Sequence, residues 1–470
     1  MEATLNQRAG QLRWTIVSEH PVRKKVFLGV AAVLLGLFAW LGVLTGGWGL
    51  AAIAMLVTAG VLLLASKREW KRNPLWLATF AVILSVLVWD LASLAAYAIP
   101  DNGDTFSSRV ATWGRDHGFS PVIDKLEAMA YRTPPSKDPA QSLGLNISVP
   151  ATTAPAATTT APAPTNTGDS VPAAVATSTT LDTTNPQPPA ALRPVISPAL
   201  PGEGQWTPIA QADGHDTLWA TSLRPLTTAG GVVATMVAID QTYLRASMFN
   251  GTEEPGGGPW KKGNHVPVSL QPQLIATMNG GFRFEHIHGG YMNEGKVVKP
   301  LKQGDATIAI DKTGKMVMGK LGRDLQDDGS WASMRQNLEL IVDNGASNVA
   351  QGTADGVWWG ADNGNAVYVK RSGVCALPDG RLAYVLVDQV DAEQFAQSLI
   401  TLGCTRAMQL DINVDWPSFA IYNWANNKSS PHFVDKRMSG NLRRYVDGST
   451  KEFFAFFDRK QVPAGTVLDT

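Results

Sequence analysis

The chain has 470 residues, of which 40 are basic and 40 acidic, so its formal net charge is zero. This balance excludes nucleic-acid binding through bulk positive charge. Two cysteines are too few for a disulfide framework or a cysteine-rich zinc site. Only 17% of the residues are charged, against roughly 25% in ordinary soluble domains, and residues 26–66 contain no charge at all.

The first hundred residues predict a membrane anchor. A transmembrane helix needs about 20 apolar residues. The uncharged stretch 26–66, with a glycine-rich break at 45–49, therefore predicts two spans, and residues 75–99 predict a third. Basic residues precede the first span and separate the second from the third. This pattern places the N-terminus in the cytoplasm and the chain after Pro100 outside the cell membrane.

A stalk follows the predicted anchor. Of residues 151–200, 33 are Ala, Thr or Pro, a composition that cannot bury a core. The predicted organisation is a cytoplasmic N-terminus, three transmembrane helices, juxtamembrane helices, a linker and an extracytoplasmic domain, at residues 1–25, 26–99, 100–132, 133–204 and 205–470.

The C-terminal part predicts many strands and one clear helix. The strand-like runs are Val232–Asp240, Leu274–Met278, Thr307–Ile310, Leu338–Val342, Ala366–Lys370, Arg381–Val387, Ala407–Asp411 and Glu452–Phe457. A helix is predicted at Ala392–Leu402, capped by Asp391 with Gln394 three residues later. Because it lies between two predicted strands, we expect a βαβ crossover. The predicted fold class is an α/β (or α+β) domain with a mixed sheet, tethered to an N-terminal bundle of three transmembrane helices.

Polar residues at strand ends carry the candidate chemistry. Asn279, Gly280 and Gly281 follow a predicted strand, where bare backbone N–H groups and an amide can hold a ligand. Arg371, next to Ser372, can bind a phosphate or carboxylate through two parallel hydrogen bonds, or form a surface salt bridge.

Two further segments complete the set. Leu340–Gly345 is an apolar strand that ends in a turn, and Leu402–Asp411 leads from the predicted helix through a strand to a carboxylate. In this order and spacing, the four segments resemble the phosphodiester glycosidase family, over about residues 230–460. The resemblance implies hydrolysis of a sugar linked through a phosphodiester. It implies that Asp411 or Asp415 is the catalytic acid/base, while Arg371 and the amides of Asn279–Gly281 hold the phosphate.

The chain departs from the family pattern after Asp411. The family has a glycine-rich loop there, whereas this chain has Ile412–Ser418, without glycine. Trp416 can stack on a sugar face, and Asn413 and Asp415 can bond sugar hydroxyls. The site therefore handles a different glycan, or catalysis has been lost.

Two histidines follow the Asn-Gly-Gly-Phe turn. His286 and His288 can bind substrate, supply a general acid or hold a divalent metal with Glu285 and Asn293. They can equally be ordinary polar loop residues. No other cofactor is expected.

The leading prediction is a membrane-anchored, outward-facing glycosidase that acts on a sugar-phosphodiester or a related envelope glycan. The alternative is a non-catalytic glycan-binding or envelope-assembly protein on the same fold. The expected partners are a glycan or sugar-phosphate substrate and the membrane, with no nucleic acid.

The two cysteines predict one disulfide. Cys375 and Cys404 flank segments that we expect to be neighbours in one sheet, and an extracytoplasmic domain lies where thiols are not kept reduced. The alternative is a pair of buried free thiols.

Overall fold

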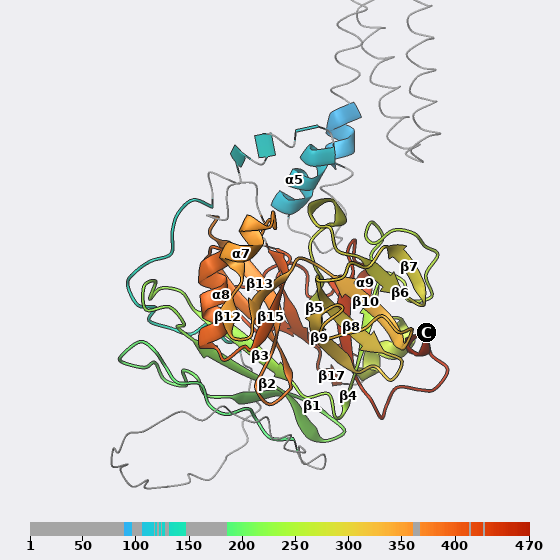
Figure 1. Cartoon of the computed structure of the whole chain (residues 1–470). Coiled ribbons are helices and arrows are strands. Elements are labelled where there is room, and N and C mark those ends of the chain that lie inside the picture. The colour runs from blue at the N-terminus through green and yellow to red at the C-terminus, as the bar shows by residue number, and fades with distance from the viewer. Residues whose placement is uncertain are drawn as a thin grey trace, which may run out of the picture. The chain divides into compact units, whose positions relative to one another are not determined.

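A computed structural model describes ten stretches of the chain (Figure 1), which are 89–95, 106–116, 118–119, 122–123, 125–126, 131–146, 186–360, 367–412, 415–425 and 428–470. They belong to two units, each considered by itself. The first contains residues 89–95 and helix α5 (Phe106–Asp116). The second contains all the described strands.

The largest sheet has eight strands. Their order across the sheet is β1-β2-β3-β14-β13-β15-β11-β12. Their bounds are β1 Thr207–Ala212, β2 His215–Leu223, β3 Ala234–Ile239, β14 Leu382–Val390, β13 Val369–Ala376, β15 Arg406–Ile412, β11 Leu340–Asp343 and β12 Ala346–Ser347.

Two five-stranded sheets and one short hairpin complete the β structure. The first sheet runs β7 (Lys296–Lys299), β6 (Tyr291–Asn293), β10 (Trp331–Gln336), β8 (Ala306–Asp311) and β9 (Met316–Lys320). The second runs β19 (His432–Phe433), β16 (Phe419–Ile421), β5 (Leu274–Asn279), β20 (Phe453–Asp458) and β4 (Leu244–Phe249). The hairpin pairs β17 (Trp424–Ala425) with β18 (Lys428–Ser429).

The helices of this unit are short. They are α7 Val349–Ala354, α8 Ala392–Thr401 and α9 Arg444–Asp447, with 3-10 turns η2 Val268–Gln273, η3 Phe284–His286 and η4 Val467–Asp469. In Figure 1, α7 and α8 lie together beside the eight-stranded sheet.

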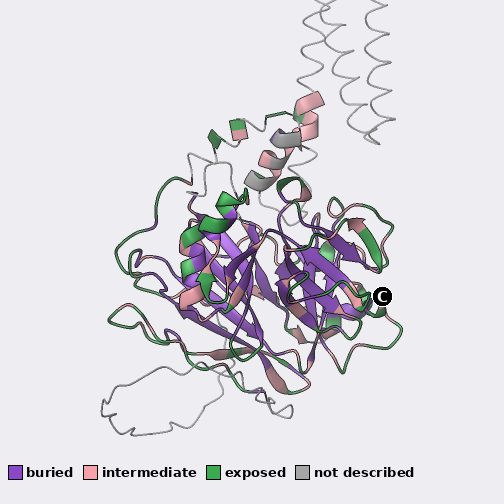
Figure 2. Ribbon diagram, viewed as in Figure 1, coloured by how far each residue is buried: buried purple, intermediate pink, exposed green. Residues whose placement is uncertain are grey.

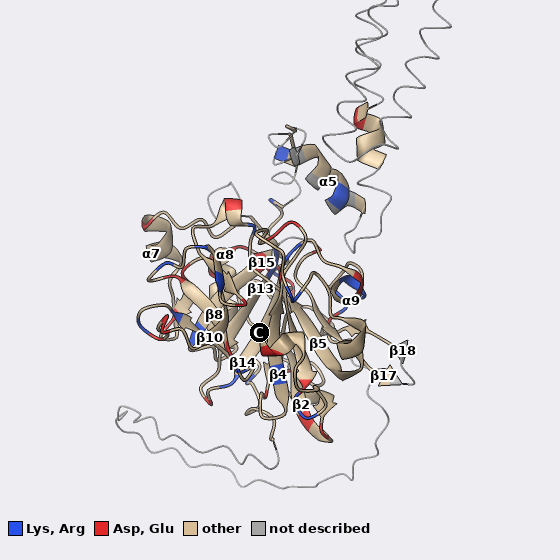
Figure 3. Ribbon diagram, turned by 90° about the vertical axis from the view of Figure 1, so that its right-hand side faces the viewer, with Lys and Arg blue, Asp and Glu red and all other residues tan. Residues whose placement is uncertain are grey.

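The eight-stranded sheet is buried on both faces. On one face, Val237 and Tyr384 share a core cluster with residues of both five-stranded sheets, such as Met278 and Ile308. On the other face, neighbouring strand residues pack against Phe395 and other side chains of α8. The strands are accordingly buried along most of their length (Figure 2) and carry few charges, which gather in loops and short helices (Figure 3). Burial of apolar side chains on both sides of the sheet holds the three sheets together.

The predicted fold class is wrong. The described structure is mostly β-sheet with few helices, and every ladder between its named strands is antiparallel, so the sheet is not mixed. The predicted strand positions were close to those in the structure. The predicted capping box at Asp391 and Gln394 is confirmed. The error came from how the strands pair.

The helix α8 does connect two strands of the same orientation, β14 and β15. However, β13 lies between them and pairs with both in antiparallel fashion. The crossover therefore spans a strand that precedes it in the sequence, and no parallel pair forms. A single sequence contains no local signal that β13 lies between β14 and β15 in the sheet.

No helix among the described residues is long and apolar enough to cross a membrane. The described structure therefore contains no bundle of three transmembrane helices. The predicted spans at 26–66 lie outside the described residues, as does most of the third, of which only residues 89–95 are described.

Both ends of the predicted linker contact the β-sheet unit. Asn146 donates its backbone N–H to Val434 O (2.9 Å), and Gly204 donates its N–H to Ser222 O on β2 (2.9 Å). The Arg224 side chain donates to the carbonyl of Pro198 (2.7 Å) and forms a buried ion pair with Glu203. Residues 131–146 and 186–204 are thus fixed on the domain surface, while 147–185 lie outside the described residues.

The predicted disulfide is confirmed. Cys375 on β13 and Cys404, just after α8, are bonded with their Cα atoms 5.6 Å apart. Both side chains are buried in the core beneath α8. The bond joins the end of the helix to the strand on which it packs.

We expect the double variant Cys375→Ala/Cys404→Ala to lose about 3–4 kcal/mol of unfolding free energy, because the bond closes a loop of 29 residues in the unfolded chain. Urea denaturation of the full chain, purified without reductant, measures this loss. Adding reductant to the wild-type protein should lower its stability by a similar amount and leave the variant unchanged. Two titratable thiols in the unfolded, unreduced wild type would contradict the bond.

Candidate functional site

The side chain of Asn279, at the end of β5, joins the two sheets that meet at the site. Its Nδ2 donates to Gly280 O (2.9 Å) and to Ser372 Oγ on β13 (3.1 Å). Its Oδ1 accepts from Tyr384 Oη on β14 (3.0 Å) and from the backbone N–H of Ser418 (3.0 Å). All four hydrogen-bonding positions of the buried amide are used within the protein, so Asn279 connects the two sheets, and its contact with a ligand stays a prediction.

A bulge places Asp411 at this junction. Along β13 and β15, Arg371 pairs with Ile412 but Gly373 pairs with Gln409. An advance of two residues on β13 therefore lies opposite an advance of three residues on β15. An extra residue of this kind bends a strand and redirects its side chains, often beside active sites. The backbone of Asp411 is held by Ser372 Oγ, which donates to its carbonyl (2.6 Å), and by Gly280 O, which accepts its N–H (3.1 Å).

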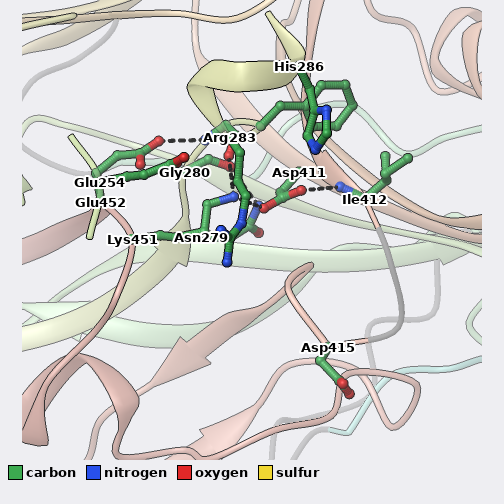
Figure 4. A network of polar contacts seen from close by, with 12 residues as sticks. Glu254, Asn279, Gly280, Arg283, His286, Asp411, Ile412, Asp415, Lys451 and Glu452 are labelled. Carbon is green, nitrogen blue, oxygen red and sulfur yellow. Dashed lines mark hydrogen bonds and ion pairs between the residues drawn. The ribbon is translucent and has the colours of Figure 1, made fainter. Parts of the chain in front are cut away.

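The Asp411 carboxylate forms an ion pair with Lys451 (Figure 4). Lys451 Nζ also donates to Gly281 O (3.0 Å), and the other carboxylate oxygen accepts from the Ile412 N–H (2.9 Å). Burial raises the pKa of Asp411 above its usual value, and Lys451 partly offsets that rise. Asp411 is 7% exposed, so a small part of it is open to solvent.

A second buried ion pair lies beneath the glycine turn. Glu452 accepts from Arg335 Nε (2.6 Å) and from the Gly281 N–H (2.9 Å) through the same oxygen. A Cβ atom on Gly280 would lie 2.5 Å from that oxygen, closer than atoms can pack, so only glycine fits. Gly280 and Gly281 therefore lie against Glu452, and their binding of a ligand stays a prediction.

A third carboxylate, Glu254, lies in the same network (Figure 4). One of its oxygens accepts from the Phe284 N–H (3.2 Å). Its other oxygen, and the second oxygen of Glu452, are buried and have no hydrogen-bond partner among the described residues. Burial raises the pKa of Glu254, and the negative charge of Glu452 raises it further, against the opposing effect of Lys451. Glu254 therefore holds a proton more readily than an exposed glutamate.

Two basic residues border Asp411 from the loop after the glycine turn. Arg283 extends beside the network in Figure 4, is partly exposed, and makes a loose ion pair with Glu253 (3.6 Å). The exposed His286, on η3, points toward the Asp411 carboxylate in the same view and contacts Glu285 (3.3 Å). His288 is exposed on the same loop.

Arg371 is fully buried. Its guanidinium donates to the carbonyls of Val390 (3.0 Å), Trp359 (2.6 Å) and Val367 (3.2 Å) and to Gln409 Oε1 (3.1 Å). Burial lowers its pKa to about 10. Through these hydrogen bonds, Arg371 connects strands with loops. Binding of a phosphate by its guanidinium stays a prediction.

Asp415 lies apart from the Asp411 carboxylate, whereas Trp416 lies against Lys451, the ion-pair partner of Asp411. Asp415 is buried, accepts from Ser439 Oγ (3.2 Å) and stands away from Asp411 in Figure 4. The Trp416 ring lies against two cations, with Lys451 Nζ 4.9 Å and Arg444 Cζ 4.7 Å from its centroid. Asn413 lies outside the described residues. The Trp416 ring therefore packs against the Lys451 ammonium. Stacking of a sugar on the Trp416 ring stays a prediction.

No group of three or more His, Cys, Asp or Glu side chains suited to a metal ion occurs among the described residues. Asn293, considered as a ligand beside His286, is buried and donates to Asn250 Oδ1 (3.1 Å) and to Met248 O (3.2 Å).

The structure thus joins Asn279, Gly280, Ser372 and Asp411 by direct hydrogen bonds, and connects Gly281 to Asp411 through Lys451. Residues 272–411 match the family model described as phosphodiester glycosidase. The resemblance is therefore confirmed for this stretch, which includes all of these residues except Lys451.

Comparisons with solved structures found distant likenesses. The chain is similar to the catalytic domain of zebrafish N-acetylglucosamine-1-phosphodiester alpha-N-acetylglucosaminidase auto-inhibited by its pro-peptide, with 16% identity and a TM-score of 0.35 over 53% of this chain and 87% of that chain. It is also similar to a hypothetical protein from Synechocystis, with 10% identity and a TM-score of 0.36 over 54% of this chain and 64% of that chain. A search of curated proteins found no match.

Sequence reasoning missed four residues of the site, of which only Arg283 lies within the matched stretch 272–411. Lys451 and Glu452 precede β20, whose apolar run was recognised only as a strand. Glu254 lies in a loop without any motif. Arg283 follows the Asn-Gly-Gly-Phe turn directly and could have been found as the first cation after it.

We expect Arg371→Met to cost about 3–5 kcal/mol of unfolding free energy, because it leaves several buried acceptors without a donor. Guanidinium denaturation measures this. The matched control is Arg323→Met, which removes an arginine with two exposed ion pairs, to Asp324 and Asp343, and should cost less than about 1 kcal/mol. A stable Arg371→Met protein that has lost only ligand binding would show that Arg371 serves the ligand.

Proposed function

We propose that this domain is an extracytoplasmic glycosidase that hydrolyses a sugar-1-phosphodiester. The observation that carries the proposal is the Asp411–Lys451 ion pair. A bulge at the end of β15 places Asp411, which is the last residue of the stretch that matches the phosphodiester glycosidase family.

The reaction requires one water molecule and two protein groups. The bond between the anomeric carbon and the phosphate oxygen breaks, the water oxygen joins that carbon, and the phosphate leaves as a monoester. Asp411, as a carboxylate, acts as base or stabilises positive charge at the anomeric carbon. Glu254, with its raised pKa, supplies the acid.

The phosphate needs a cation that is free to reach it. Arg371 is buried and its donors are bound to the protein. Arg283 is partly exposed, extends beside the network and has only a loose ion pair. We therefore assign phosphate binding to Arg283, whose guanidinium can form two parallel hydrogen bonds.

The extracytoplasmic location is supported by the buried disulfide between Cys375 and Cys404, because such bonds persist in oxidising compartments. The glycan itself is proposed only as a class, that of sugar-phosphodiesters of the cell envelope.

The alternative function is non-catalytic glycan binding or envelope assembly. It is favoured by two observations. The Asp411 carboxylate is almost entirely buried in its ion pair, and the segment Ile412–Ser418 has no glycine where the family has a glycine-rich loop.

We expect the full chain to release N-acetylglucosamine from methyl N-acetylglucosamine-1-phosphate, the linkage that the sequence resemblance implies. Asp411→Asn should reduce kcat by at least about 10³-fold, because it removes the charged group. The control, Asp240→Asn, changes a buried aspartate that accepts from the Thr242 N–H outside this network, and it should leave most activity. No release by the wild type would favour the non-catalytic alternative.

The pH profile tests the role of Lys451. Activity that needs the Asp411 carboxylate falls as the pH drops through its pKa. Replacing Lys451 by Met removes the cation that lowers this pKa, so the acid limb of kcat/KM should move to higher pH. The exposed Lys436→Met is the control. An unchanged acid limb in Lys451→Met would mean that another group controls it.

A further inference from the structure

Trp358 is an exposed indole next to a fully buried one. It is 60% exposed, whereas Trp359 is completely buried in the core beneath α8. Neighbouring residues with opposite burial point in opposite directions, so Trp358 faces away from the core. A large exposed aromatic ring loses favourable burial unless something covers it.

The backbone that carries Trp358 is firmly held. The Trp359 carbonyl accepts from Arg371 Nη1 (2.6 Å) and from Gln409 Nε2 (3.0 Å), and its indole donates to Val349 O (3.1 Å). The ring of Trp358 is therefore presented from a rigid support. A rigid support lowers the entropic cost of ordering when a ligand binds.

This support lies directly beside the candidate site. A Cβ atom on Gly360 would lie 2.6 Å from Ile412 Cδ1 and 2.8 Å from Phe282 Cζ, so the backbone of Gly360 contacts both side chains. Ile412 follows Asp411, and Phe282 follows the Asn-Gly-Gly turn. Trp358 is two residues along the chain from this contact.

Sugar rings have apolar C–H faces that pack on aromatic rings. Trp416, the aromatic residue that the sequence offered for this role, lies against Lys451 and Arg444, whereas Trp358 presents an exposed ring.

We propose that Trp358 forms a sugar-binding subsite and stacks on a pyranose ring of the substrate, while Arg283 binds its phosphate. This inference rests on the proposed function for the identity of the ligand, but its test measures binding and does not require turnover.

The experiment uses the full-length Asp411→Asn protein, to prevent hydrolysis, and isothermal titration with two probes. The probes are methyl N-acetylglucosamine-1-phosphate and inorganic phosphate. Adding Trp358→Ala should raise the Kd for the sugar diester about tenfold, because one stacked ring is lost, and should leave the Kd for phosphate unchanged. Trp358→Phe should restore most of the affinity.

The control is Val268→Ala, which removes an exposed apolar side chain (77% exposed) on η2 and should change neither Kd. Equal affinity for the sugar diester with and without the Trp358 side chain would overturn the subsite, as would an equal loss for both probes or no binding of the diester. Hydrolysis by the wild type is measured separately. The proposed function can therefore fail while the subsite is confirmed, or the reverse.

Discussion

One buried amide, that of Asn279, fixes the place where the two sheets of the site meet. Its four hydrogen bonds reach β13, β14, the turn after β5 and the segment before β16. A buried amide that lost any of these partners would be destabilised by an unsatisfied polar group. The ends of strands from two different sheets therefore keep one relative position, and Ser372 and Asp411 are placed by it.

Charge is concentrated around the same turn. Asp411 pairs with Lys451 and Glu452 with Arg335, and both pairs are buried. Buried ion pairs add little net stability, because desolvation opposes their attraction. Their value here is chemical, since they keep ionised groups in fixed positions beside Glu254, whose pKa burial raises. The same burial limits access to Asp411, whereas the side chains of Arg283 and Trp358 reach solvent.

The local elements followed from local rules. The strand runs and the capping box of α8 depend on residues close in sequence, and the disulfide could be argued from two cysteines and an oxidising location. The pairing of β13 between β14 and β15 could not, because it depends on contacts between distant segments. Because β13 lies between β14 and β15, the sheet is antiparallel and not mixed as expected.

The sequence by itself pointed to part of the site, since Asn279, Gly280, Ser372 and Asp411 were named from it and are joined by hydrogen bonds. Their charged neighbours Lys451, Glu452 and Glu254 were not. Tertiary structure decided what each one does there. The buried Arg371 donates hydrogen bonds to backbone carbonyls, and cations lie against the Trp416 ring. The physical reason is that residue type fixes what a side chain can bond, whereas exposure, which fixes whether a ligand can reach it, arises only when distant strands pack together.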